Sequence, residues 1–471
     1  MNDIQHRATV ATFWAYMQNW ISRGLSLVVF IVLARLLTPI DFGVFAIATA
    51  MLSLAEVFVE QGLSHAIVQR VELDDAHNST AFWSTLLLGI VLALLTLVIS
   101  YPLAAHFGHA KIAPIMNALS PVFVLMALAS IPAALLRREL QYKVLAQRAM
   151  LANTASGVTA IGLALAGAGV WTFVGQQLVY QLVGVIVLWK NETWRPRFEW
   201  SRYRFAELFG FSSKVISGKL LDFVETRVVD LMVGQFLGLI DLGYYSMAVR
   251  ATQALTQLTV APIWDAANSV FSKHQTNKIL LYQAYEKMLE VAGMVAIPIF
   301  VFVLSSADTI VPVVFGTQWG KSIIALQILC FVGLIRIIVF LSGVAIQASG
   351  EPGLSTFFTL IRVIGTLGFL SFSTRFGLPG VAFALLFGQL LSTPFVMASF
   401  YRIVGFGLVG FIATLKRSLL VSFSGSLIIF FAARYVDKAL YSLLLSALSF
   451  GLVYIYFFKA ELSRFMKFVT N

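Results

Sequence analysis

Apolar residues run through this chain in long, nearly unbroken stretches that are separated by short polar segments. A helix needs about 20 mostly apolar residues to cross a hydrocarbon core of roughly 30 Å, so each stretch predicts a membrane-spanning helix. The stretches do not alternate with polar residues, which argues against the strands of a membrane barrel. The pattern predicts about fourteen spans, near residues 9–34, 43–68, 80–105, 113–136, 146–167, 170–189, 207–237, 242–268, 286–305, 323–348, 354–375, 379–401, 412–433 and 439–458.

The composition supports this interpretation. Hydrophobic residues make up 59% of the 471 residues and charged residues only 12%. Soluble domains have about 45–50% apolar and about 25% charged residues. A water-soluble fold of this length could not hide so much apolar surface, because much of any folded surface faces water. We therefore predict an all-α polytopic membrane protein.

The positions of Lys and Arg predict the orientation of the chain. With the amino terminus inside, the predicted inner loops and tails hold 20 of the 33 Lys and Arg residues, and the outer loops hold six. Positive residues gather in cytoplasmic loops, so both termini are expected in the cytoplasm and the chain in the inner membrane. This topology also explains the net charge of +11, and no basic segment predicts nucleic acid as a partner.

One turn occurs twice. Residues 36–48 read LLTPIDFGVFAIA and residues 236–248 read FLGLIDLGYYSMA, which agree at five of thirteen positions at an offset of 200. The copies join spans one and two and spans seven and eight, which predicts two six-helix lobes related by a parallel repeat, with two helices appended. The expected boundaries are 1–190 for the N-terminal lobe, 191–206 for an amphipathic linker, 207–402 for the C-terminal lobe and 403–471 for spans thirteen and fourteen.

Two further segments bear on this organisation. The longest inner loop, KNETWRPRFEWSRYRF at 190–205, is basic and aromatic, which suits a linker helix at the headgroup level. A weaker repeat places a Gly-Gln pair both in GVWTFVGQQL at 169–178 and in GVAFALLFGQLL at 380–391. Coincidence explains this second repeat as well as duplication does.

Seven cationic residues lie inside the predicted spans, where a charge that faces lipid costs about 2.5–3.5 kcal/mol on insertion scales. They are Arg23, Lys214, Lys219, Arg227, Arg250, Arg336 and Arg362. Helical spacing puts Asn19 on the polar stripe of Arg23, and Gln253 and Gln257 on that of Arg250. We expect the stripes to line a water-filled cavity between the lobes. The candidate substrate-binding residues are Arg23, Arg250, Lys219, Arg227, Arg336, Arg362, Asn19, Gln253 and Gln257.

Acidic residues in the spans leave a second interpretation open. Glu56, Asp222 and Asp265 are candidate sites for a coupling H⁺ or Na⁺, but the same acids, with Glu225 and Asp230, could form structural salt bridges with the cations. Arg23 and Arg250 have no carboxylate three or four positions away in their own helices, which favours substrate contact. Because a guanidinium binds phosphate oxygens through two parallel hydrogen bonds, the cavity is expected to select an anionic headgroup.

The chain resembles the oligosaccharide-lipid flippases of polysaccharide biosynthesis (Wzx-type, multidrug/oligosaccharidyl-lipid/polysaccharide exporter superfamily), in particular the branch of the colanic acid exporter. The resemblance rests on LARLLTPIDFGVFAIATAMLSLAEVFVEQGLSHAIVQR at 33–70 and LGYYSMAVRATQAL at 242–255. It implies alternating access and a polyprenyl-pyrophosphate-linked oligosaccharide as substrate, with cationic contacts that match Arg23 and Arg250. Related flippases also use a basic residue on span two, where this chain has Glu56 and Glu60.

Two other function classes stay open at this point. A multidrug efflux transporter of the same superfamily would bind cations and would favour a net acidic cavity. A membrane-embedded polymerase or ligase would need a large outer loop, and every predicted outer loop is short. No cofactor or metal is predicted: GFGLVG at 405–410 lacks the strand that a nucleotide site requires. Candidate partners are membrane lipids, the coupling ion and a polysaccharide polymerase complex.

Overall fold

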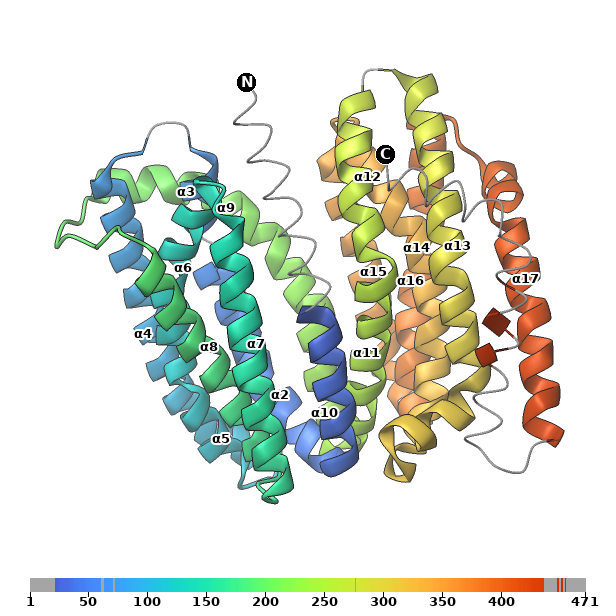
Figure 1. Cartoon of the computed structure of the whole chain (residues 1–471), viewed down its shortest axis with the longest axis horizontal. Coiled ribbons are helices and arrows are strands. Elements are labelled where there is room, and N and C mark those ends of the chain that lie inside the picture. Colours follow the sequence, from blue (N-terminus) through green and yellow to red (C-terminus); the bar gives the residue numbers. More distant parts are fainter. Residues whose placement is uncertain are drawn as a thin grey trace. The chain divides into compact units, whose positions relative to one another are not determined.

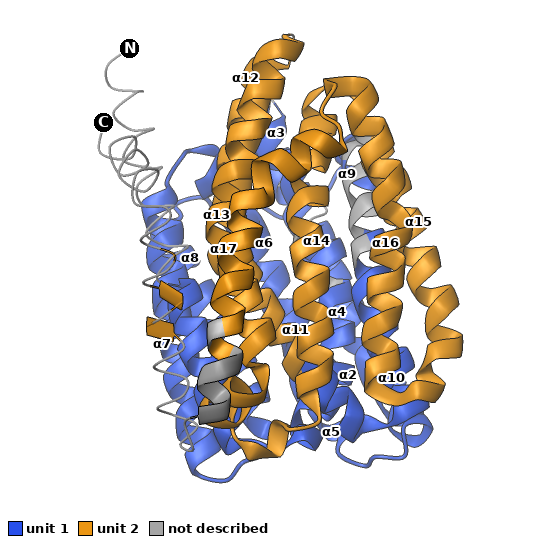
Figure 2. Cartoon of the chain, turned by 90° about the vertical axis from the view of Figure 1, so that its right-hand side faces the viewer, with its two compact units in different colours: residues 1–246 blue, residues 247–471 orange. Residues whose placement is uncertain are grey.

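A computed structural model of the chain describes residues 22–60, 63–70, 73–275 and 277–435, together with residues 447, 448, 450, 451 and 454. Within these residues every regular element is helical (Figure 1). The all-α fold class is therefore confirmed. The chain divides into two compact units, residues 1–246 and 247–471, which Figure 2 shows in different colours. The predicted boundaries at 190, 206 and 402 stay predictions.

The first unit packs its helices mainly as long pairs, α7 with α8 and α4 with α6. A cluster of buried side chains that includes Ile67, Phe82, Ile131 and Leu208 joins α3, α4, α6 and α9. After the helical residues 22–36, the elements are α2 (Pro39–Ala55), η1 (Glu56–Glu60), α3 (Leu63–Gln69), α4 (Asp75–His106), α5 (Ile112–Leu119), α6 (Pro121–Arg138), α7 (Tyr142–Leu165), α8 (Trp171–Asn191), α9 (Arg202–Phe223), η2 (Val224–Val228), α10 (Val229–Leu237) and the start of α11 (Leu239–Thr259).

The second unit holds longer helices, and α14 and α15 both pack against α16. A buried aromatic cluster ties α13 to the chain around Phe400 and Phe406, where Tyr285 lies 4.3 Å and 5.1 Å from the two rings. The elements after α11 are α12 (Ala261–His274), α13 (Lys278–Ile310), η3 (Val311–Phe315), η4 (Thr317–Trp319), α14 (Ser322–Ala348), α15 (Pro352–Ser373), η5 (Thr374–Phe376), α16 (Gly377–Val404) and α17 (Leu408–Tyr435).

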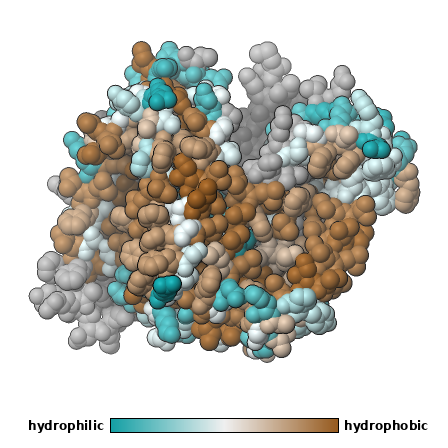
Figure 3. All heavy atoms as spheres, turned by 180° about the vertical axis from the view of Figure 1, so that it is seen from behind, coloured by the Kyte–Doolittle hydropathy of each residue, from teal (hydrophilic) through white to brown (hydrophobic). Residues whose placement is uncertain are grey.

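Eight stretches of the described residues are long and apolar enough to cross a membrane. They begin at Pro39, Asp75, Ile112, Trp171, Lys278, Ser322, Gly353 and Leu408, and the stretch 353–404 contains both α15 and α16. The predicted spans 146–167, 207–237 and 242–268 are helical but fall outside these eight. Figure 3 shows apolar residues over most of one face, with hydrophilic residues gathered at its upper and lower margins. The count of fourteen stays a prediction.

The segment between α8 and α9 differs from the expected linker helix. Residues 192–201 are not helical, and we call them the strap. The strap follows the beginning of α4: the Trp83 indole donates to the carbonyl oxygen of Arg197 at 2.7 Å, and the Trp200 indole donates to the Ser84 hydroxyl at 3.0 Å. A proline disfavours helical backbone angles at the residue before it, so Pro196 argues against a helix in this segment.

Candidate functional site

The two copies of the duplicated turn lie against each other within the first unit. A Cβ atom placed on Gly43 would lie 1.8 Å from the carbonyl oxygen of Leu239, and one placed on Gly243 would lie 1.7 Å from that of Pro39. Pro39 and Leu239 are equivalent positions of the repeat, so the contact is reciprocal. Glycine lets two helix backbones approach this closely because it has no side chain. Each copy of the turn is thus the packing surface of the other.

Local chemistry fixes the first copy of the turn. Pro39 occupies the first helical position of α2, where its fixed φ suits a helix start. The backbone N–H and the hydroxyl of Thr38 both donate to the Asp41 carboxylate, at 3.0 and 2.6 Å. That carboxylate also lies beside Gly169, which has a φ of +56° in the connection from α7 to α8. The Asp41 carboxylate therefore contacts both Thr38 at the start of α2 and the connection from α7 to α8.

Arg227 has a carboxylate partner. It lies in the π-helical turn η2 and donates to Asp230 at 3.0 Å, with 30% of the Arg227 side chain and 10% of the Asp230 side chain exposed. Glu225 of the same turn is also buried. π-Helical turns inside helices often occur at functional sites. The pair fits the salt-bridge interpretation, and the role of Arg227 as a substrate contact stays a prediction.

The other candidates of the first unit and of α11 are distributed over several helices. Arg23 is half-buried within the helical residues 22–36, and Glu56 is exposed at the start of η1. Arg250 is half-buried on α11, while Gln253 and Gln257 of that helix are exposed. Asn19 and the side chains of Lys214, Lys219, Asp222 and Asp265 lie outside the described part of the chain. Their roles stay predictions.

Arg336 and Arg362 both lie near one point of α16. The Arg336 Nε donates to Oε1 of Gln389 at 3.4 Å, and the backbone of Arg362 packs against Gly388. Gln389 is fully buried, and its Nε2 has no hydrogen-bond partner among the described residues. A buried donor without a partner is uncommon. In the sequence the Gly388-Gln389 pair forms only a weak repeat, which does not predict its place beside two of the candidate cations.

Ion pairs fasten the strap and α9 to the beginning of α4 and to the end of α3. Arg204 donates to Asp74 at 2.6 Å, Arg197 lies 3.6 Å from Asp75, and Arg70 pairs with Glu207. His77 lies between Asp74 and Glu207, at 2.6 and 3.4 Å. Burial alone would raise the pKa of the Asp74 carboxyl, but hydrogen bonds from His77 and Arg204 outweigh it and lower that pKa to about 2.

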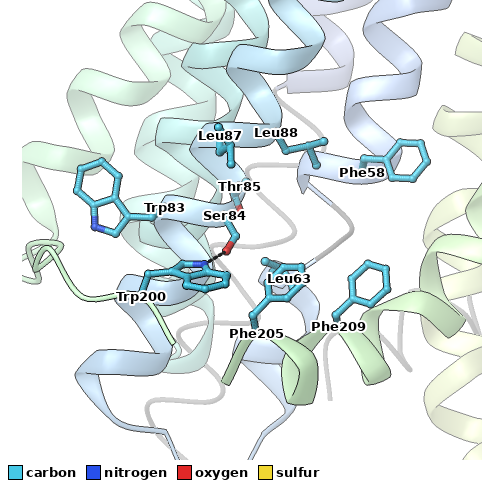
Figure 4. Close-up of a pocket in the computed structure, with 10 residues that line it drawn as sticks. All are labelled: Phe58, Leu63, Trp83, Ser84, Thr85, Leu87, Leu88, Trp200, Phe205 and Phe209. Carbon is cyan, nitrogen blue, oxygen red and sulfur yellow. Dashed lines mark hydrogen bonds between the residues drawn. The ribbon is translucent and has the colours of Figure 1, made fainter. Parts of the chain in front are cut away.

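An apolar cavity of about 520 Å³ lies beside this ionic cluster. Figure 4 shows that its wall comes from α4, the strap and α9, with Phe58 and Leu63 added from η1 and α3. The two hydroxyl groups in the wall are satisfied locally, because Ser84 donates to the carbonyl oxygen of Thr80 and Thr85 to that of Ala81. Leu87, Trp200 and Phe209 are among its exposed lining residues. No pattern in the sequence predicts this cavity, because its wall comes from segments far apart in the chain.

The chain is similar in sequence to known proteins of polysaccharide biosynthesis. A family model described as "Polysaccharide biosynthesis protein" matches residues 32–324. The succinoglycan biosynthesis transport protein ExoT of Rhizobium meliloti is 26% identical over 366 residues, which are 76% of this chain and 73% of that protein. The lipopolysaccharide biosynthesis protein WzxC of Escherichia coli is 24% identical over 391 residues, 81% of this chain and 78% of that protein.

Solved structures show the same fold. The lipid II flippase MurJ in an inward closed conformation superposes with a TM-score of 0.78 at 15% identity, over 96% of this chain and all of that one. An inward-facing multidrug resistance MATE transporter gives 0.65 at 18% identity, over 81% and 94% of the two chains. The fold is thus that of MurJ and the MATE transporters, and the chain is a multi-pass protein of the inner membrane. The family model covers more than half of the sequence, and the chain belongs to the polysaccharide biosynthesis protein family.

Proposed function

We propose that this protein is an alternating-access transporter that flips a polyprenyl-pyrophosphate-linked oligosaccharide across the inner membrane during polysaccharide biosynthesis. One observation carries the proposal: the family match over residues 32–324 includes both copies of the duplicated turn. The MurJ-like fold supports it, because two related helical halves are suited to rocking motions. The proposed activity is transport and involves no catalysis.

The proposed substrate contacts are cationic and amide side chains. Arg23 and Arg250 each bind pyrophosphate oxygens, since a half-buried guanidinium makes strong bidentate hydrogen bonds to phosphate. Lys219, Arg227, Arg336 and Arg362 add positive charge, and Asn19, Gln253 and Gln257 bind sugar hydroxyls. The buried Nε2 of Gln389, which has no partner within the described residues, is a further donor for a substrate oxygen.

Coupling, assembly and orientation complete the proposal. Glu56, Asp222 or Asp265 takes up the H⁺ or Na⁺ that drives the transport cycle, and both termini lie in the cytoplasm. A polysaccharide polymerase complex receives the flipped oligosaccharide. Imposing a proton or sodium gradient on proteoliposomes tests the coupling, because a coupled transporter changes its flipping rate with the gradient and an uncoupled one does not.

Deletion of the gene tests the function itself. We expect lipid-linked repeat units to accumulate on the cytoplasmic leaflet, with surface polysaccharide restored by the wild-type gene. The alternative is a cation-coupled multidrug efflux transporter, and it is tested by the susceptibility of the same deletion strain to cationic dyes. We expect this susceptibility to equal that of the wild-type strain. Loss of dye resistance with normal polysaccharide would favour efflux and contradict the flippase.

A further inference from the structure

The position of the cavity along α4 indicates its depth in the membrane. Its wall residues on α4 are Trp83 to Leu88, which are 8 to 13 residues after Asp75. At 1.5 Å per residue this is about 12–20 Å along the helix, whereas the headgroup layer is only about 5–8 Å thick on each side of a bilayer. With the charged start of α4 at Asp75 taken as the water-facing side of the headgroup layer, the cavity opens within the hydrocarbon region, just inside the headgroups.

Water is a poor occupant of this cavity. A buried water needs two to four polar partners, and the hydroxyl groups of Ser84 and Thr85 already donate to backbone carbonyl oxygens. The Trp200 indole N–H is likewise taken by Ser84, as Figure 4 shows. Leu87 is 64% exposed, so the cavity is open to the surrounding lipid. A hydrocarbon chain is the chemistry that fits it.

Arg202, which pairs with no carboxylate among the described residues, lies next to the cavity on α9. Arg202, Phe205 and Phe209 are spaced three and seven residues apart on α9, which puts them on one face of the helix. Both phenylalanines line the cavity, and Arg202 begins the helix about one turn beyond Phe205. Arg202 is exposed and makes no ion pair with any described residue, whereas the neighbouring Arg197 and Arg204 are neutralised by Asp75 and Asp74.

We propose that this cavity binds one anionic phospholipid of the adjacent leaflet, with an acyl chain between α4 and α9 and the phosphate at Arg202. The Arg202 guanidinium, which pairs with no carboxylate among the described residues, matches the one negative charge of a phosphodiester better than the several charges of a pyrophosphate. The bound lipid would join the strap, α4 and α9. The proposal does not depend on the proposed function, since it rests on the cavity and its rim alone.

Photo-crosslinking tests this site in the full-length protein. The protein is reconstituted in phosphatidylcholine nanodiscs with a trace of phosphatidylglycerol that carries a diazirine in its acyl chain, and labelled peptides are identified by mass spectrometry. We expect label on the α4 and α9 segments that line the cavity. Unlabelled phosphatidylglycerol should compete about fivefold better than phosphatidylcholine, which corresponds to the ~1 kcal/mol that one cation contributes near an anionic lipid.

Two variants and their matched controls separate the chain site from the headgroup site. Leu87→Trp fills the cavity and should remove the label, whereas Leu94→Trp, two turns along the exposed side of α4 and outside the lining, should not. Arg202→Gln should abolish the preference for phosphatidylglycerol and keep the label, while Lys190→Gln, an exposed cation at the end of α8, should change neither.

Several outcomes would overturn the proposal. Equal labelling of wild type and Leu87→Trp would show that the chain lies elsewhere. Equal competition by the two phospholipids on wild type, or an unchanged preference in Arg202→Gln, would remove the headgroup site. More efficient competition by a polyprenyl phosphate than by phosphatidylglycerol would assign the cavity to the tail of a lipid-linked sugar and would refute our choice of occupant.

Discussion

Replacing Gly43 by Ala perturbs the contact between the two copies of the turn. The added Cβ would lie 1.8 Å from the Leu239 carbonyl oxygen, and ordinary contact begins near 3.4 Å, so the backbones of α2 and α11 must separate by about 1.6 Å. The obstacle is backbone, which cannot rotate away as a side chain does. Overpacking of this kind costs typically 1–3 kcal/mol. The closed packing of the turns should therefore fall in population by about 5–150-fold relative to a separated state.

Electron spin resonance measures this separation directly. Nitroxide labels at Leu36→Cys and Ile240→Cys report the distance between the turns, because both positions are exposed and flank the contact. Cys330 is buried and should not react with the label. Wild type should give a short-distance population that decreases in Gly43→Ala. Gly162→Ala is the matched control, since a Cβ there meets no atom within 4 Å.

The contact is reciprocal, so the second glycine provides a second test of the same packing. Gly243→Ala should act like Gly43→Ala, because its Cβ would lie 1.7 Å from the equivalent carbonyl oxygen of Pro39. The double variant should resemble either single variant, since turns that have already separated leave room for the second methyl group. Distance distributions and unfolding temperatures that match wild type in both single variants would refute the reasoning. Fully additive effects would show that the two glycines act through independent contacts.

Three further predictions concern the charged and polar groups. Arg23→Ala and Arg250→Ala should each slow flipping in proteoliposomes about 10–100-fold, because each loses roughly 1.5–3 kcal/mol of charge-assisted hydrogen bonding. The control variant Arg375→Ala should flip at the wild-type rate. Normal rates in both test variants would remove Arg23 and Arg250 from the site. The pKa of Asp74 is lowered from 3.8 to about 2, so its stabilising effect is present above about pH 4 and is lost as the pH falls toward 2. Unfolding temperatures recorded between pH 5 and 2 should therefore fall less in Asp74→Asn than in wild type, and equal slopes would contradict the ion-pair account. In an Arg336→Met background, where the Oε1 acceptor no longer serves Arg336, Gln389→Met should raise the free energy of unfolding by about 1 kcal/mol. It removes a buried donor that has no partner among the described residues, which costs roughly 1–3 kcal/mol, and a lower unfolding temperature would show that the Nε2 group has a partner.

The strap is bound to the beginning of α4 and leads directly into α9. Its Trp200 indole and the backbone N–H of Arg197 are bound to α4 at Ser84 and Ser79, and its Arg197 side chain is paired with Asp75. Arg204 of α9 is paired with Asp74. Exposed ion pairs of this kind contribute at most about 1 kcal/mol each. The hydrogen bonds to α4 and the stacking of Phe198 on Trp83, with ring centroids 4.9 Å apart, add to them. Together they fix the direction in which α9 enters the membrane.

Some properties of this protein follow from the sequence because they depend on local composition. Whether a helix can cross lipid depends on the length and hydropathy of one segment, so the all-α fold class and most spans could be predicted. The duplicated turn was visible because both copies need the same short pattern of Asp and Gly. The family resemblance of the chain rests on the segments that contain the two copies of this turn, and the family model confirms it.

Other properties were decided by tertiary contacts between residues far apart in the chain. The sequence placed Arg227 three residues before Asp230, but only the structure showed that the two are paired. It could not show that Gly43 packs on the backbone of Leu239 and Gly243 on that of Pro39. Nor could it show that Gln389 lies beside Arg336, or that the strap leaves a cavity against α4. Hydropathy records how much a segment prefers lipid, and a close contact depends on the shapes of both surfaces, which no single segment contains.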